Sequence, residues 1–106
     1  MQVVVDNREG ADPRFVGDLR AALLDAGCKV EMRDPLPQSV LDTTVHFIVE
    51  GVAVRVPQET ERDDLDVVVS AVRAALARRG EHQRFRAVPV YRGETNQVLT
   101  WVDVFD

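Results

Sequence analysis

The sequence contains a single cysteine, Cys28, among its 106 residues. A lone cysteine can form no internal disulfide, and it cannot supply the several thiolates of a structural zinc site. The only two histidines, His46 and His82, are isolated in the sequence and match no metal-binding motif. We therefore expect neither a disulfide framework nor a bound metal or other cofactor.

Basic residues are outnumbered, with 13 Lys and Arg against 18 Asp and Glu, which gives a formal net charge of −5. Such a surface repels phosphate backbones and anionic lipids, so general nucleic-acid or membrane binding is disfavoured. No apolar run approaches the roughly 20 residues of a membrane span. The first residues, MQVVVDN, also lack the basic and apolar parts of a signal peptide. The sequence therefore predicts a cytoplasmic protein.

Aromatic residues make up only 6% of the chain, whereas hydrophobic residues in total make up 45%. The hydrophobic content is typical of a globular protein, and the core is expected to consist of small aliphatic side chains. The sequence has no internal repeat, linker or low-complexity tract. We therefore expect residues 1–106 to form one domain.

Hydrophobic periodicity predicts six strands and two helices. The strands are expected over 3–5, 28–33, 44–49, 52–56, 85–91 and 98–105, and the helices over 13–26 and 60–79. Each helix carries one apolar stripe, so both can pack on the same face of a sheet. The order β-α-β-β-β-α-β-β thus predicts an α+β two-layer sandwich with a mixed, largely antiparallel sheet, ferredoxin-like in character.

Local signals support several of these boundaries. Asp12 and Pro13 are suited to begin the first helix, and Gly27 to end it in a left-handed conformation. Glu50-Gly51 is interpreted as a tight hairpin turn, with a glycine kink in one long strand as the alternative. Pro89 cannot donate a ladder hydrogen bond and favours an edge position for its strand.

No motif for catalysis or phosphate binding is present. The loop Asp6–Gly10 stands where α/β proteins bind phosphates, but it has one glycine and its acidic residues would repel an anion, so a solvated connection is expected. The acidic run Glu59–Asp66 lacks the spacing of a calcium loop and is interpreted as the start of a helix. The charged side chains are therefore expected to serve solubility and helix ends, and no enzyme activity is predicted.

Two single residues with chemical potential are interpreted as structural. His46 alternates with Val45 and Phe47 and is expected on the outer face of its strand. Cys28 follows the end of a helix, where the negative end of the dipole disfavours a thiolate, so it is expected to be a small buried hydrophobe.

Arginines and aromatics gather in the C-terminal part of the chain. Tyr91, Trp101 and Phe105 lie in the expected closing hairpin, and core packing is the first interpretation of these rings. The alternative is a partner surface, because edge strands offer unpaired backbone groups and aromatics anchor interfaces. The candidate interaction residues are Arg84, Arg86, Tyr91, Arg92, Trp101 and Phe105.

The helix that closes at Arg78-Arg79-Gly80, followed by the strands Val88–Tyr91 and Val98–Val104, resembles a family of small bacterial domains. These domains are the effector-associated constant components, which are abundant in actinobacteria. The resemblance covers the C-terminal half and rests on hydrophobic patterning. It implies a non-enzymatic adaptor that couples effector modules in bacterial conflict or immunity systems, with no catalytic residues to carry over.

Three functions remain open at this point. The first is a non-catalytic interaction or adaptor domain that binds a protein partner or a second copy of itself as a homodimer. The second is a small-ligand-binding or enzymatic domain whose site assembles from Asp6, Arg8, His46 and Arg55. The third, weaker, is single-stranded nucleic-acid binding through the basic region Arg78–Arg92.

Overall fold

The computed structural model describes residues 1–7, 11–33, 43–78 and 86–105. Within these ranges the chain forms the predicted elements in the predicted order. They are β1 (Gln2–Asn7), α1 (Pro13–Asp25), β2 (Lys29–Arg33), β3 (Thr44–Val49), β4 (Val52–Pro57), α2 (Arg62–Ala77), β5 (Arg86–Arg92) and β6 (Val98–Phe105).

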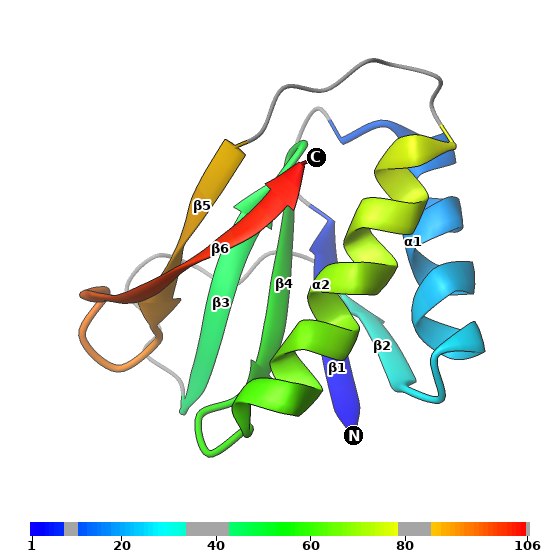
Figure 1. Cartoon of the computed structure of the whole chain (residues 1–106). Helices are drawn as coiled ribbons and strands as arrows, with labels where there is room; N and C mark the ends of the chain where they lie inside the picture. The colour runs from blue at the N-terminus through cyan, green and yellow to red at the C-terminus, as the bar shows by residue number, and fades with distance from the viewer. Residues whose placement is uncertain (8–10, 34–42, 79–85, 106) are drawn as a thin grey trace.

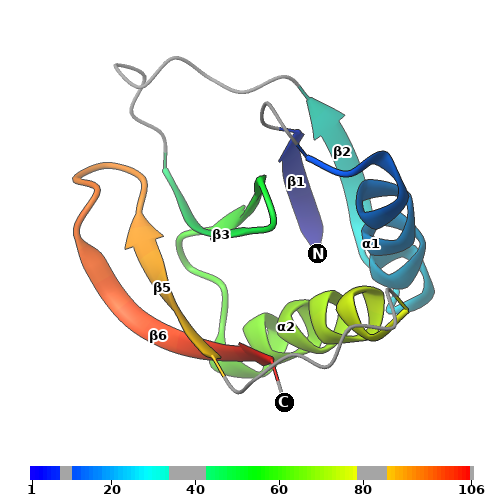
Figure 2. The same cartoon turned by 90° about the horizontal axis from the view of Figure 1, so that it is seen from above.

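The six strands form one open sheet in the order β2-β1-β4-β3-β5-β6. β1 and β2 run parallel, and every other neighbouring pair is antiparallel. Both helices lie against the same side of this sheet (Figures 1 and 2). The predicted α+β two-layer sandwich is therefore confirmed. β1 and β2 are direct neighbours, whereas a split β-α-β unit has a strand between them, so the likeness to a ferredoxin-like fold lies in the layers and not in the strand order.

The core lies between the helices and the sheet face that they cover. Alternate residues of β1 and β4, Val3 and Val5 with Val52 and Val54, are fully buried on that face. Phe15 is the buried aromatic that α1 adds. A core of small aliphatic side chains with few aromatics is what the composition predicts.

Local geometry confirms the predicted boundaries. The side chain of Asp12 accepts a hydrogen bond from the backbone N–H of Arg14 at 2.9 Å and caps α1. Gly27 follows the helix with φ of 86°. Glu50 and Gly51 form the turn between β3 and β4 with φ of 50° and 79°. Two consecutive left-handed residues make a tight hairpin, which confirms the predicted turn over the alternative of a glycine kink.

Pro89 is not in an edge strand, which corrects the expectation from its missing N–H. β5 lies between β3 and β6, but it pairs with β3 only through Tyr91 and Arg92. Pro89 lies outside this short pairing, and β5 turns away from β3 along its length (Figure 1). The proline is tolerated inside the sheet because no ladder on the β3 side needs a donor at this position.

No helix in the described ranges is long and apolar enough to cross a membrane.

Candidate functional site

The sheet face opposite the helices carries a line of polar side chains. Val3 and Val5 of β1 point into the core, so Asp6 points to the other face. The same alternation places Arg55 of β4 and His46 of β3 on that face, next to each other in the register. We call Arg33, Asp6, Arg55, His46 and Tyr91 the polar network.

Asp6 is the fully buried centre of the polar network. Its Oδ1 accepts a hydrogen bond from Arg33 Nε at 2.7 Å, and its Oδ2 accepts one from Arg55 Nε at 2.6 Å. Arg55 stands opposite Val4 in the register, and Ala53 stands opposite Asp6. Arg55 thus reaches Asp6 diagonally, and the small Ala53 side chain leaves room for it. The two ion pairs connect β2, β1 and β4.

His46 and Tyr91 continue this line toward the other half of the sheet. Arg55 Nη1 lies 3.3 Å from His46 Nδ1. The rings of His46 and Tyr91 stack with centroids 5.5 Å apart and an interplanar angle of 29°. One series of contacts therefore crosses five neighbouring strands, β2-β1-β4-β3-β5, on the face that the helices leave uncovered.

The polar network overturns two expectations. Asp6 is not part of a solvated loop but of β1, where its carboxylate is buried between two guanidiniums. The view that the charged residues serve only solubility and helix ends is wrong for Asp6, Arg33 and Arg55. His46 lies on the outer face of its strand as expected, but this face is buried at His46.

The charged side chains of the polar network contact one another directly. Both carboxylate oxygens of Asp6 receive charge-assisted hydrogen bonds, so they are occupied by donors. A guanidinium can only donate, so Arg55 is the donor in its contact with Nδ1 of His46. Asp6, His46 and Arg55 of the ligand-binding alternative do come together, joined by the contacts of Arg55 with Asp6 and His46. Arg8 lies outside the described residues.

No three potential metal-ligating side chains gather anywhere in the part of the chain that the structure describes. Cys28 is buried, as predicted.

The second candidate site is the edge of the sheet at β6. Val98, Leu99 and Trp101 expose 47%, 46% and 56% of their surfaces. Trp101 is therefore not a core residue, and the core-packing interpretation is wrong for this ring. Val102 and Val104 do point into the core, so β6 is held to the domain by one face and presents the other to solvent.

Further along the strand, α2 contacts the backbone of β6. Arg73 Nε donates to the carbonyl oxygen of Asp103 at 2.8 Å, and Arg73 Nη2 contacts the same oxygen. This interaction covers the outer edge of β6 at Asp103. The stretch Val98–Val102 precedes it, and β6 is the last strand of the sheet on this side.

The other predicted interaction residues are placed as follows. Tyr91 and Arg92 are half-buried, and Tyr91 stacks on His46 as described above. Arg86 and Phe105 lie in β5 and β6, but their side chains are outside the described part. Residues 79–85 of the basic region Arg78–Arg92, Arg84 among them, also lie outside the described residues.

Comparison with known proteins gives no relative for this chain: no family model, no curated protein and no solved structure matches it.

Proposed function

We propose that this chain is a non-catalytic protein-interaction domain that binds its partner along the edge of β6. The observation that carries the proposal is Trp101, a large aromatic that is more than half exposed on an edge strand, next to Val98 and Leu99. An edge strand offers a row of unpaired N–H and C=O groups, and natural proteins usually protect it with charges, prolines or a covering segment. The stretch Val98–Val102 contains neither a charge nor a proline.

The backbone of β6 is suited to accept a further strand. Pro89 of β5 stands opposite Trp101 of β6 and has no N–H. The two residues therefore cannot form both backbone hydrogen bonds of a hydrogen-bonded pair. Two residues on, the carbonyl of Asp103 is reached by Arg73 of α2. Because backbone groups alternate along a strand, both observations indicate that Trp101 directs its N–H and C=O away from β5.

The partner in this proposal is a second copy of the chain. An antiparallel pair of identical strands is self-complementary and closes with two-fold symmetry, so it needs no second kind of surface. Arg73 limits the pairing to Val98–Val102, which places the two-fold axis at Thr100 and sets Leu99 of each copy opposite Trp101 of the other. Aromatic–aliphatic pairs of this kind stabilise paired strands. The dimer would continue the sheet across the two copies.

A domain that joins proteins without chemistry of its own fits the adaptor role that the resemblance to effector-associated constant components implies. Both carboxylate oxygens of Asp6 accept hydrogen bonds from Arg33 and Arg55, which supports the same non-catalytic proposal.

Size-exclusion chromatography with light scattering tests the proposal. We expect the wild-type chain to be a dimer at micromolar concentration and Trp101→Ala to be a monomer. Leu24→Ala is the matched control, because Leu24 is an exposed apolar residue of α1 (43% exposed) and lies away from β6. A wild-type monomer at high concentration, or a dimer that Trp101→Ala leaves unchanged, would overturn the proposal.

A further inference from the structure

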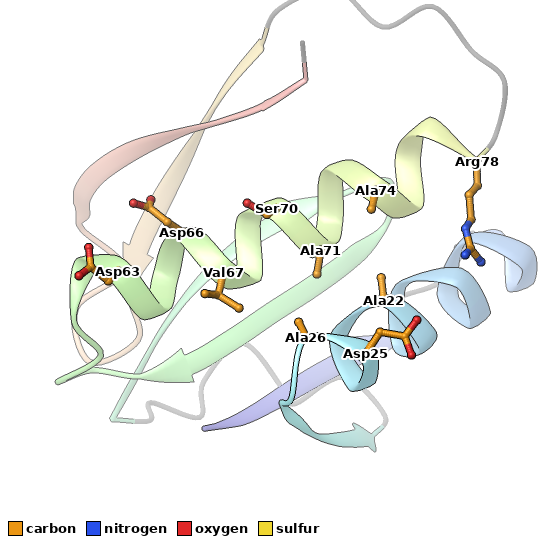
Figure 3. Close-up of a pocket in the computed structure, with 10 residues that line it drawn as sticks. All are labelled: Ala22, Asp25, Ala26, Asp63, Asp66, Val67, Ser70, Ala71, Ala74 and Arg78. Carbon is orange, nitrogen blue, oxygen red and sulfur yellow. The ribbon is translucent and has the colours of Figure 1, made fainter.

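A groove of about 470 Å³ lies between α1 and α2 (Figure 3). Its lining on α2 extends from Asp63 to Arg78, which at about 1.5 Å per residue corresponds to about 22 Å of helix. Most of the lining residues are exposed, so the groove opens on the side of the helices turned away from the sheet. It shares no residue with β6 or with the polar network.

The floor of the groove is formed by small apolar side chains. Val67 and Ala71 of α2 point toward α1, and Ala22 and Ala26 from the α1 side point toward α2 (Figure 3). Alanine at such positions lets another backbone approach closely, because helices pack at the shorter end of the 8–10 Å range where their contact residues are small. The groove is thus open along two helices and fits an elongated apolar surface.

The rim of the groove is acidic at one end. Asp63 and Asp66 of α2 lie at that end, Asp25 of α1 lies further along the groove beside Ala22, and Arg78 lies at the opposite end (Figure 3). Arg78 lies 3.8 Å from Asp18 of α1, and Asp66 lies 3.5 Å from Arg62, so the charges of Arg78 and Asp66 are both partly balanced within the domain. The groove therefore combines an apolar floor with a negative potential, and the net charge of the whole chain has the same sign.

We propose that this groove binds a basic amphipathic helix of a partner protein. Apolar residues at helical spacing would cover Val67 and the alanines, and lysines or arginines would lie beside Asp63 and Asp66 at one end and beside Asp25 further along. An amphipathic helix in a groove is a general mode of recognition, and opposite charge selects the partner and its direction. The inference goes beyond the strand pairing at β6 and does not rest on it. If both surfaces are used, the pairing at β6 joins two copies of the chain, and each copy binds one partner helix.

The test uses three synthetic peptides of 18 residues and the full chain. The first carries leucines at i, i+3, i+4 and i+7 with lysines elsewhere, the second has the same composition in scrambled order, and the third has glutamate in place of lysine. Fluorescence anisotropy measures each affinity, and amide chemical shifts locate the bound peptide. We expect the basic amphipathic peptide to bind at least tenfold more tightly than the other two and to shift amides around Val67 and Ala71.

Variants of the chain separate the groove from general electrostatic attraction. Asp25→Lys with Asp66→Lys reverses two rim charges at exposed positions and is expected to weaken binding at least tenfold. Ala74→Leu fills the floor at an exposed site without changing charge and is expected to weaken it too. Asp64→Lys is the control, because Asp64 is exposed on α2 but does not line the groove. Circular dichroism checks that each variant is folded.

Three outcomes would overturn the inference. These are equal binding of the scrambled or acidic peptide, equal weakening by the Asp64→Lys control, and chemical-shift changes confined to β6. The last outcome would show that the peptide binds at the strand edge. Loss of dimerisation in Trp101→Ala concerns the β6 pairing alone and would leave peptide binding in the groove unchanged.

Discussion

The carboxylate of Asp6 and the guanidinium of Arg55 lie 2.6 Å apart, between neighbouring antiparallel strands, although the register does not place the two residues opposite each other. Ala53 occupies the position opposite Asp6, and Arg55 extends past it. The pair is almost fully buried on the sheet face opposite α1 and α2. The ion pair therefore connects β1 and β4 on that face.

Asp6→Asn is expected to destabilise the domain by about 3–5 kcal/mol, because the substitution leaves two guanidiniums without their buried counter-charge. Urea unfolding followed by circular dichroism measures the change. Asp66→Asn is the control, since the ion pair of Asp66 with Arg62 is exposed on both sides and is expected to contribute about 0–1 kcal/mol. Equal effects of the two substitutions would show that the Asp6 pairs do not stabilise the sheet.

The stack of Tyr91 on His46 predicts a contrast between two substitutions. Tyr91→Phe keeps the ring and is expected to change stability by less than about 0.5 kcal/mol, whereas Tyr91→Ala removes the stack, which contributes about 0.5–1.5 kcal/mol in addition to the lost burial. Thermal unfolding of both variants measures the difference. Tyr91→Phe should also remain a dimer, since the ring is part of the polar network and not of the β6 edge. A monomeric Tyr91→Phe would place the interface elsewhere than Val98–Val102.

Two glycines predict opposite effects of the same substitution. Gly51→Ala is expected to destabilise by about 1–2 kcal/mol, because Gly51 has φ of 79° and the new Cβ would lie 3.3 Å from Ala11 Cα. Gly17→Ala is expected to stabilise by about 0.5–1 kcal/mol, because Gly17 lies in α1 and a Cβ there meets nothing within 4 Å. Urea midpoints of the two variants measure both. Changes of the same sign would contradict the hairpin geometry at Gly51 or the open space at Gly17.

The fold could be predicted because its signals are local. The alternation in Val52, Val54 and Val56, the stripes of the two helices and the turn at Glu50-Gly51 each occupy a short stretch of sequence. Exposure at β6 could not be predicted in this way. Alternation shows which residues share a face with Trp101, but the edge position of β6 depends on pairings between distant strands.

Burial of Asp6 was missed for a related reason. The apolar run ends at Val5, so the strand was expected to end there, and the partners Arg33 and Arg55 are 27 and 49 residues away. One local signal was present. Arg55 interrupts a strand of valines that is buried along its length, and a buried arginine requires a carboxylate close to it.

The most direct test of the β6 pairing is disulfide cross-linking of Thr100→Cys under mild oxidation. A two-fold axis at Thr100 brings the two new cysteines directly opposite each other, with Cα atoms about 4.5–5.5 Å apart, which suits a disulfide. The native Cys28 is buried and does not compete. We predict rapid formation of a covalent dimer by Thr100→Cys and none by Ser70→Cys, whose site is exposed on α2. Equal cross-linking of the two variants, or none by Thr100→Cys, would contradict strand pairing along β6.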